Sequence, residues 1–70
     1  MTSAVTLSPL LQRLEELRGL CPDVRLGQLM AILGELGEDA TGRGLWDLED
    51  DQLATAMEQF ANDLRRRSTE

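Results

Sequence analysis

Leucine dominates three stretches of this chain, and in each stretch the apolar residues recur every three or four positions. That spacing places them along one side of an α-helix, whereas a half-buried strand requires strict alternation. The three stripes are Leu7, Leu10, Leu11, Leu14 and Leu17; Leu26, Leu29, Met30, Leu33 and Leu36; and Leu53, Met57, Phe60 and Leu64. The pattern predicts an all-α domain with three helices, over residues 8–19, 23–36 and 49–66.

Residues that favour helix ends lie beside the first two stripes. Ser8 can cap the first helix ahead of Pro9, whose missing N–H costs nothing in a first turn. Gly19 is expected to end this helix, because glycine readily leaves the helical conformation. By the same reasoning we expect Asp23 to cap the second helix and Gly37 to end it.

A glycine-rich, acidic hinge over residues 37–48 is expected to join the second and third predicted helices. The third helix then opens at Glu49. The side chain of Gln52 is placed to accept a hydrogen bond from the N–H of Glu49, as in a capping box.

Seventy residues allow one small domain, which we place at 8–67 between a flexible tail at 1–7 and a frayed end at 68–70. A domain of this size buries only about 60% of the surface that its unfolded chain exposes, so it usually needs a disulfide, a metal or a partner chain. Cys21 is the single cysteine and histidine is absent, so no internal disulfide can form and the commonest metal ligand is missing. A partner chain is the remaining support, either a second copy or a larger protein.

The formal net charge of −6 is concentrated in one segment. Residues 35–51 hold seven acidic side chains against the single base Arg43, whereas the remaining charges balance. An acidic segment repels phosphate backbones and attracts basic protein surfaces, so we expect no nucleic-acid binding and favour a basic protein partner. The alternative is that these acids serve only solubility and the dipole of the helix that follows.

Trp46 lies between the glycines of the hinge and the acidic start of the third predicted helix. We expect its indole to cover the open end of the core. The alternative is an aromatic anchor for a protein partner, because tryptophan is enriched among the interface residues that dominate binding energy. The acidic rim of that anchor would be Asp47, Glu49, Asp50 and Asp51.

A stripe of small residues, Gly27, Ala31 and Gly34, shares one face of the second predicted helix. Each glycine inside a helix costs about 1 kcal/mol relative to alanine, so a compensating contact is expected. Close packing of another helix, from this chain or from a second copy, would provide it. The alternative is that the stripe faces water and the helix tolerates the cost.

Two stretches have part of the spacing of a ligand-binding loop. Residues 37–44 have the glycine spacing of a phosphate loop, but Arg43 stands where lysine is required and no strand precedes it. Residues 47–58 place acids at calcium-loop positions, but Gln52 replaces the required glycine and the third stripe requires this stretch to be helical. Without histidine, Cys21 has no general base. We therefore predict no catalytic, cofactor-binding or metal-ligating residues, and no enzyme activity.

The stretch PDVRLGQLMAILGEL, followed by LWDLEDDQLATAMEQF, resembles small uncharacterised bacterial helical proteins with a PDxRxGQL…EDxxL pattern. The resemblance covers about half of the chain and carries no activity with it. It implies a small α-helical bacterial protein with a polar group formed by Arg25, Gln28, Glu49 and Asp50. Within that group, an ion pair of Arg25 with Asp50 or Glu49 would join the second helix to the third.

No apolar run approaches the roughly 18 residues of a membrane helix, and the N-terminus lacks a secretory pattern, so a cytoplasmic location is expected. The sequence thus predicts a non-enzymatic protein–protein interaction module or small accessory subunit without a cofactor. It would self-associate, most simply as a dimer, or bind a larger protein with a basic surface through helix packing and the acidic segment. The alternative is an acidic inhibitor of the immunity type, which covers a basic site on a toxin or a nucleic-acid-binding protein.

Overall fold

The computed structural model of the chain describes residues 8–68. Three α-helices and one short 3-10 helix make up this part, and it contains no β-strand. The elements are α1 (Pro9–Leu20), α2 (Leu26–Thr41), η1 (Leu45–Asp47) and α3 (Asp50–Ser68). The prediction of an all-α, three-helix protein is confirmed. The predicted tail at 1–7 lies outside the described residues, as do residues 69 and 70, and Ser68 is the last residue of α3.

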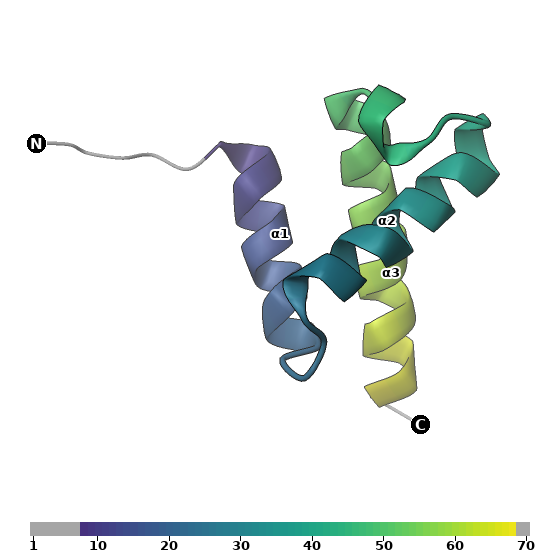
Figure 1. The fold of residues 1–70 in the computed structure, drawn as a ribbon. Helices are drawn as coiled ribbons and strands as arrows, with labels where there is room; N and C mark the ends of the chain where they lie inside the picture. The colour runs from purple at the N-terminus through teal and green to yellow at the C-terminus, as the bar shows by residue number, and fades with distance from the viewer. Residues whose placement is uncertain (1–7, 69–70) are drawn as a thin grey trace, which may run out of the picture.

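The longest helix, α3, is the element on which α1 and α2 both pack. Figure 1 shows α1 beside α3 and running in the same direction, while α2 crosses at a steep angle. The short helix η1 packs on α2, whereas α1 and α2 make few contacts with each other. The helices are therefore arranged openly around α3, and a wedge-shaped groove lies between α1 and α2.

The core lies where α1 and α2 meet α3. It consists of six buried hydrophobic residues: Leu17, Leu29, Leu33, Ala56, Met57 and Ala61. The two buried alanines of α3 lie on either side of Met57 in the sequence, and their small side chains let the neighbouring helices approach closely. The core is aliphatic, as the leucine stripes require, and it is small.

The starts of α1 and α3 follow the sequence pattern. The N–H of Leu11 donates to Oγ of Ser8 at 3.2 Å, and the N–H of Glu49 donates to Oε1 of Gln52 at 2.9 Å. Each of these side chains satisfies a backbone donor that the first turn leaves without an intrahelical partner. The predicted roles of Ser8 and Gln52 are confirmed.

The start of α2 differs from the prediction. Asp23 does not cap this helix but lies in the preceding turn, which is closed by a hydrogen bond from the N–H of Val24 to the carbonyl of Cys21 at 3.0 Å. The helix begins three residues later, where the N–H of Arg25 donates to Oε1 of Gln28 at 2.9 Å. Glutamine thus caps α2 in the way it caps α3.

The predicted end of the first helix agrees with the structure to within one residue, whereas the predicted end of the second helix at Gly37 is wrong. α1 continues past Gly19 by one residue, and α2 continues past Gly37 to Thr41. Gly42 ends α2, with a φ of 77° in the left-handed region that glycine adopts without strain. The connection between α2 and α3 is therefore shorter than the hinge predicted at 37–48.

Candidate partner-binding site

Two leucines fix η1 and the residue after it against the surface of α2. Leu45 lies over Gly34, where an added Cβ would be 3.3 Å from its own Cβ, and Leu48 lies over Gly37, where an added Cβ would overlap its Cδ1. A larger residue at either glycine would push these leucines away from the helix backbone. Gly37 is thus required for a close approach, which explains why it lies within a helix rather than at its end.

The loop between α2 and α3 is held by its own hydrogen bonds. The N–H of Arg43 donates to Oγ1 of Thr41 at 3.0 Å, and the N–H of Asp47 donates to the carbonyl of Gly44 at 2.9 Å. With both leucines anchored, these bonds give the loop a defined path. The side chains that it carries therefore have defined directions.

Trp46 points away from the protein. A 3-10 helix has three residues per turn, so Leu45 and Leu48 share the side that faces α2 while Trp46 lies on another side. The residue is 96% exposed. The expectation that Trp46 covers the open end of the core is wrong, because Leu45 and Leu48 already pack against α2 there.

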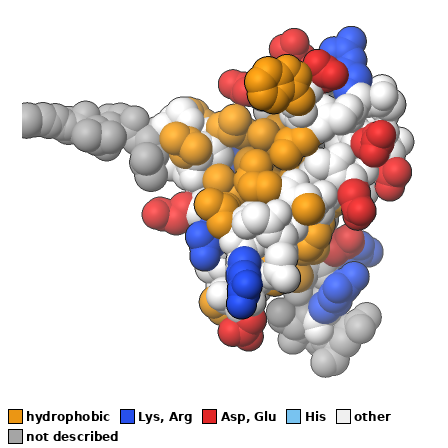
Figure 2. All heavy atoms as spheres, in the orientation of Figure 1, with side chains coloured by type: hydrophobic (Ala, Val, Ile, Leu, Met, Phe, Trp, Pro, Cys, Tyr) orange, Lys and Arg blue, Asp and Glu red, His pale blue; other side chains and the backbone are white. Residues whose placement is uncertain are grey.

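Four acidic residues that follow Trp46 in the sequence, Asp47, Glu49, Asp50 and Asp51, are exposed as well. None of them forms an ion pair within residues 8–68. Figure 2 shows acidic side chains beside a hydrophobic group at the end of the molecule where η1 and the start of α3 lie. We call these four residues together with Trp46 the acidic end.

Part of this acidity stabilises α3. Asp50 and Asp51 lie in the first turn, where carboxylates interact favourably with the helix dipole. Oδ1 of Asp51 also accepts a hydrogen bond from the N–H of Gln52 at 2.9 Å. Helix stability therefore accounts for two of the acids, while Asp47 and Glu49 precede the helix.

The predicted ion pair between Arg25 and Asp50 does not form. Arg25 precedes α2 and Asp50 begins α3, and Figure 1 shows these two helix starts well apart. The chain reaches α3 only after the full length of α2, so the start of α3 lies near the end of α2. The pair is thus excluded by the direction of α2.

Within residues 8–68, the stripe of small residues does not pack against another α-helix. A Cβ at Gly27 would have no atom within 4 Å, and Ala31 is exposed. Only Gly34 has a close neighbour, the side chain of Leu45. Within the chain the prediction of close helix packing at these residues is wrong, and η1 uses only one end of the stripe.

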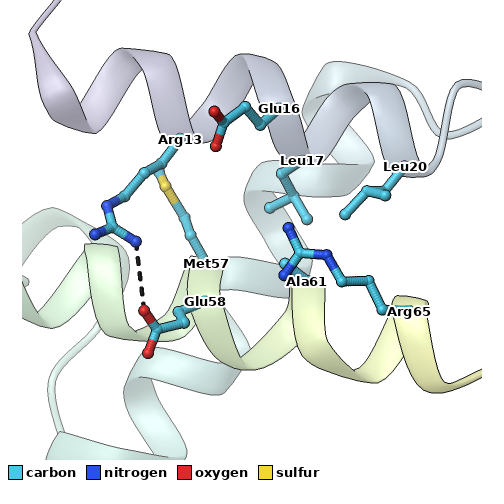
Figure 3. A pocket seen from close by; sticks show the side chains of 8 residues that line it. All are labelled: Arg13, Glu16, Leu17, Leu20, Met57, Glu58, Ala61 and Arg65. Carbon is cyan, nitrogen blue, oxygen red and sulfur yellow. Dashed lines mark hydrogen bonds and ion pairs between the residues drawn. The ribbon is translucent and has the colours of Figure 1, made fainter.

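An ion pair between α1 and α3 was not predicted. Nη1 of Arg13 lies 3.5 Å from Oε2 of Glu58, beside a cavity of about 90 Å³. Figure 3 shows these two side chains pointing toward each other, with Arg65 reaching from α3 toward Leu17. Both members of the pair are about half exposed or more (49% and 61%), so solvent screens it and it contributes little to stability. The signal in the sequence was weak, because the two residues lie on different helices.

Cys21, the only cysteine of the chain, directly follows α1. Sγ of the half-buried Cys21 donates to the carbonyl of Leu17 at 3.3 Å. Over residues 8–68, no three side chains of histidine, cysteine, aspartate or glutamate come together in a way that could hold a metal ion. In the same part of the chain, no helix has both the length and the apolar character that are needed to cross a bilayer.

No family model, no curated protein and no solved structure matches this chain. The resemblance to small bacterial helical proteins therefore stays a prediction.

Proposed function

We propose that this chain is a non-enzymatic protein–protein interaction module that binds a larger protein through the acidic end. The observation that carries the proposal is the 96% exposure of Trp46 among four exposed carboxylates. Tryptophan is the largest apolar side chain, and its burial in an interface contributes more than that of most residues. Here the fold presents it on an anchored loop rather than burying it.

The chemistry of the acidic end defines the partner. An indole binds into an apolar pocket, and a rim of carboxylates favours a pocket surrounded by lysine or arginine. The charges would speed the encounter of the two proteins, and the indole would slow their dissociation. The expected partner is therefore a basic protein with a pocket for one aromatic side chain.

The test begins by capturing proteins from an extract of the source organism on the immobilised chain, and on a Trp46→Ala variant. We expect a basic protein that binds the native chain and is lost from the variant. Leu20→Gln provides a matched control, since Leu20 is 39% exposed but lies at the end of α1, outside the acidic end. Proteins that bind all three chains equally would contradict the proposal.

Binding kinetics with the purified partner then separate the two contributions. Replacing Glu49, Asp50 and Asp51 with their amides should lower the association rate at low salt and leave the dissociation rate largely unchanged. Trp46→Ala should raise the dissociation rate by at least about tenfold, as expected for an interface residue that contributes 1.4 kcal/mol or more. Equal rates for the native chain and both variants would show that the acidic end is not the binding surface.

A narrower version of this function is an inhibitor that covers a basic site on a toxin or nucleic-acid-binding protein. The absence of ion pairs on the four carboxylates, within residues 8–68, favours it because such charges can mimic a phosphate backbone. An inhibitor should abolish nucleic-acid binding by the captured protein at equimolar concentration. A captured protein that binds nucleic acid and its partner together would support the accessory subunit instead.

A further inference from the structure

A second surface of interest lies between α1 and α2. Because these two helices make few contacts with each other, a groove of about 460 Å³ separates them. Its lining residues are Leu11, Leu14, Glu15, Arg18 and Leu26, which we call the α1–α2 groove. Figure 2 shows hydrophobic side chains gathered on this face, over α1 and α2.

The leucines of the groove are incompletely covered by the chain itself. Leu11 is 50% exposed and Leu26 is 44% exposed, although both belong to the apolar stripes. Covering either leucine would remove apolar surface from water, which is favourable in proportion to the area buried. A core of six buried residues makes such additional burial valuable to a chain of this size.

The groove contains one acidic and one basic side chain, and neither is paired within the described residues. Glu15 and Arg18 lie one turn apart on α1, and neither forms an ion pair with any residue between 8 and 68. In a two-fold dimer the same surface faces itself, so that residue i of one copy contacts residue j of the other and the reverse. A groove with one acid and one base at its edge is therefore complementary to its own copy.

The distribution of charge along the chain also favours a second copy as the occupant of the groove. Residues 8–34 carry three arginines and three acids, whereas residues 35–51 carry the whole net charge of −6. Two copies would repel each other if they met at their acidic ends, but not if they met at a neutral face. The groove lies in the neutral part.

We infer that a second copy of this chain covers the α1–α2 groove in a two-fold dimer, in which Glu15 of each copy faces Arg18 of the other. The groove shares no residue with the acidic end, so this inference does not rest on the proposed function. The dimer leaves both acidic ends available, and the assembly presents two sites for the larger partner.

Sedimentation equilibrium of the full chain, from micromolar to millimolar concentration, tests the dimer. We expect the mass to rise from 7.8 kDa toward twice that value as the concentration increases. Leu11→Gln should weaken the dimer by at least about tenfold, because each dimer loses two leucine contacts. Leu20→Gln should leave it unchanged, since Leu20 lies on the same helix but outside the groove.

Charge reversal tests the orientation of the two copies. Glu15→Arg alone and Arg18→Glu alone should each weaken self-association by about tenfold, because each places like charges opposite one another twice. An equimolar mixture of the two variants should restore association, since every contact then joins an arginine to a glutamate. Circular dichroism of each variant before mixing shows whether it is folded.

Three results would overturn the inference. They are a native chain that stays monomeric at millimolar concentration, equal effects of Leu11→Gln and Leu20→Gln, and a mixture of folded charge variants that does not associate. None of them would affect binding at the acidic end, because Trp46 belongs only to that surface.

Discussion

In the core, Leu17, Leu29 and Leu33 are at most 1% exposed, whereas at the acidic end the larger side chain of Trp46 is 96% exposed. In both regions leucines pack inward, because Leu45 and Leu48 beside Trp46 lie against α2. They differ in which side chains the local backbone geometry exposes to solvent. In the core the apolar stripe of each helix faces its neighbours, and at the acidic end one turn of 3-10 helix turns its aromatic residue to solvent.

The comparison indicates which residues the fold requires. Full burial of a large apolar side chain stabilises a protein by about 1.5–3 kcal/mol, which is a substantial fraction of the stability of a small domain. The fold gains that contribution from the buried leucines and does not gain it from Trp46. Trp46 is therefore available for the partner binding that we propose.

The largest expected effect is at Leu33, which is completely buried. Leu33→Ala should lower the free energy of unfolding by about 2–5 kcal/mol, because it removes apolar contacts and leaves a cavity. Trp46→Ala should change that free energy by less than about 0.5 kcal/mol, as is usual for an exposed residue. Urea unfolding at low protein concentration measures both without a contribution from association.

The comparison would break down if Trp46→Ala cost as much stability as Leu33→Ala. That result would mean that the indole packs against the protein in solution and that the acidic end is part of the core.

Replacing either of two glycines of α2 by alanine should change the free energy of unfolding by a smaller amount, and the two changes should have opposite signs. Gly37→Ala should lower the free energy of unfolding by about 1 kcal/mol, because displacing Leu48 costs more than alanine's higher helix propensity gains. Gly27→Ala should raise it by about 0.5–1 kcal/mol, since nothing lies within 4 Å of the new Cβ. Thermal unfolding of the two variants side by side provides the measurement.

If Gly37→Ala stabilised the protein as much as Gly27→Ala does, Leu48 would not hold the loop against α2. The defined direction of Trp46 would then lose its structural basis.

The smallest effect is expected at the surface ion pair between α1 and α3. Glu58→Gln should lower the free energy of unfolding by only a few tenths of a kcal/mol, because Arg13 and Glu58 are both well exposed. The loss should shrink further in high salt, where exposed charges are screened. If Glu58→Gln lowered the free energy of unfolding by more than about 1 kcal/mol, this surface pair would stabilise the fold as much as some core contacts do, which would contradict the comparison.

The helices and most of the core could be predicted from the sequence because leucine spacing directly encodes a helix face. Ser8 and Gln52 were also predictable, since their hydrogen bonds join residues three apart in the chain. The ends of the helices were not, because glycine serves two purposes that the sequence does not separate. Gly42 supplies a left-handed backbone, whereas Gly37 supplies space for Leu48.

The residues of the candidate site could be predicted from the sequence, but their arrangement in space could not. The sequence identified Trp46 and the acids beside it, yet the direction of the indole depends on the three-residue period of η1, a short element that propensity does not reveal. The ion pair of Arg25 with Asp50 failed for a similar reason, because helix direction is set by packing. The α1–α2 groove depends on how α1 and α2 each pack on α3, which no local pattern encodes.

Fluorescence of Trp46, the only tryptophan, reports whether the indole of the folded protein faces solvent. The account predicts that the folded protein emits at nearly the same wavelength as the urea-unfolded chain. When the quenching by each ion is divided by its quenching of free N-acetyltryptophanamide, caesium should give the larger ratio and iodide the smaller, because the carboxylates nearby attract cations and repel anions. A blue-shifted emission in the folded state, with weak quenching by both ions, would show a buried indole and would contradict the account.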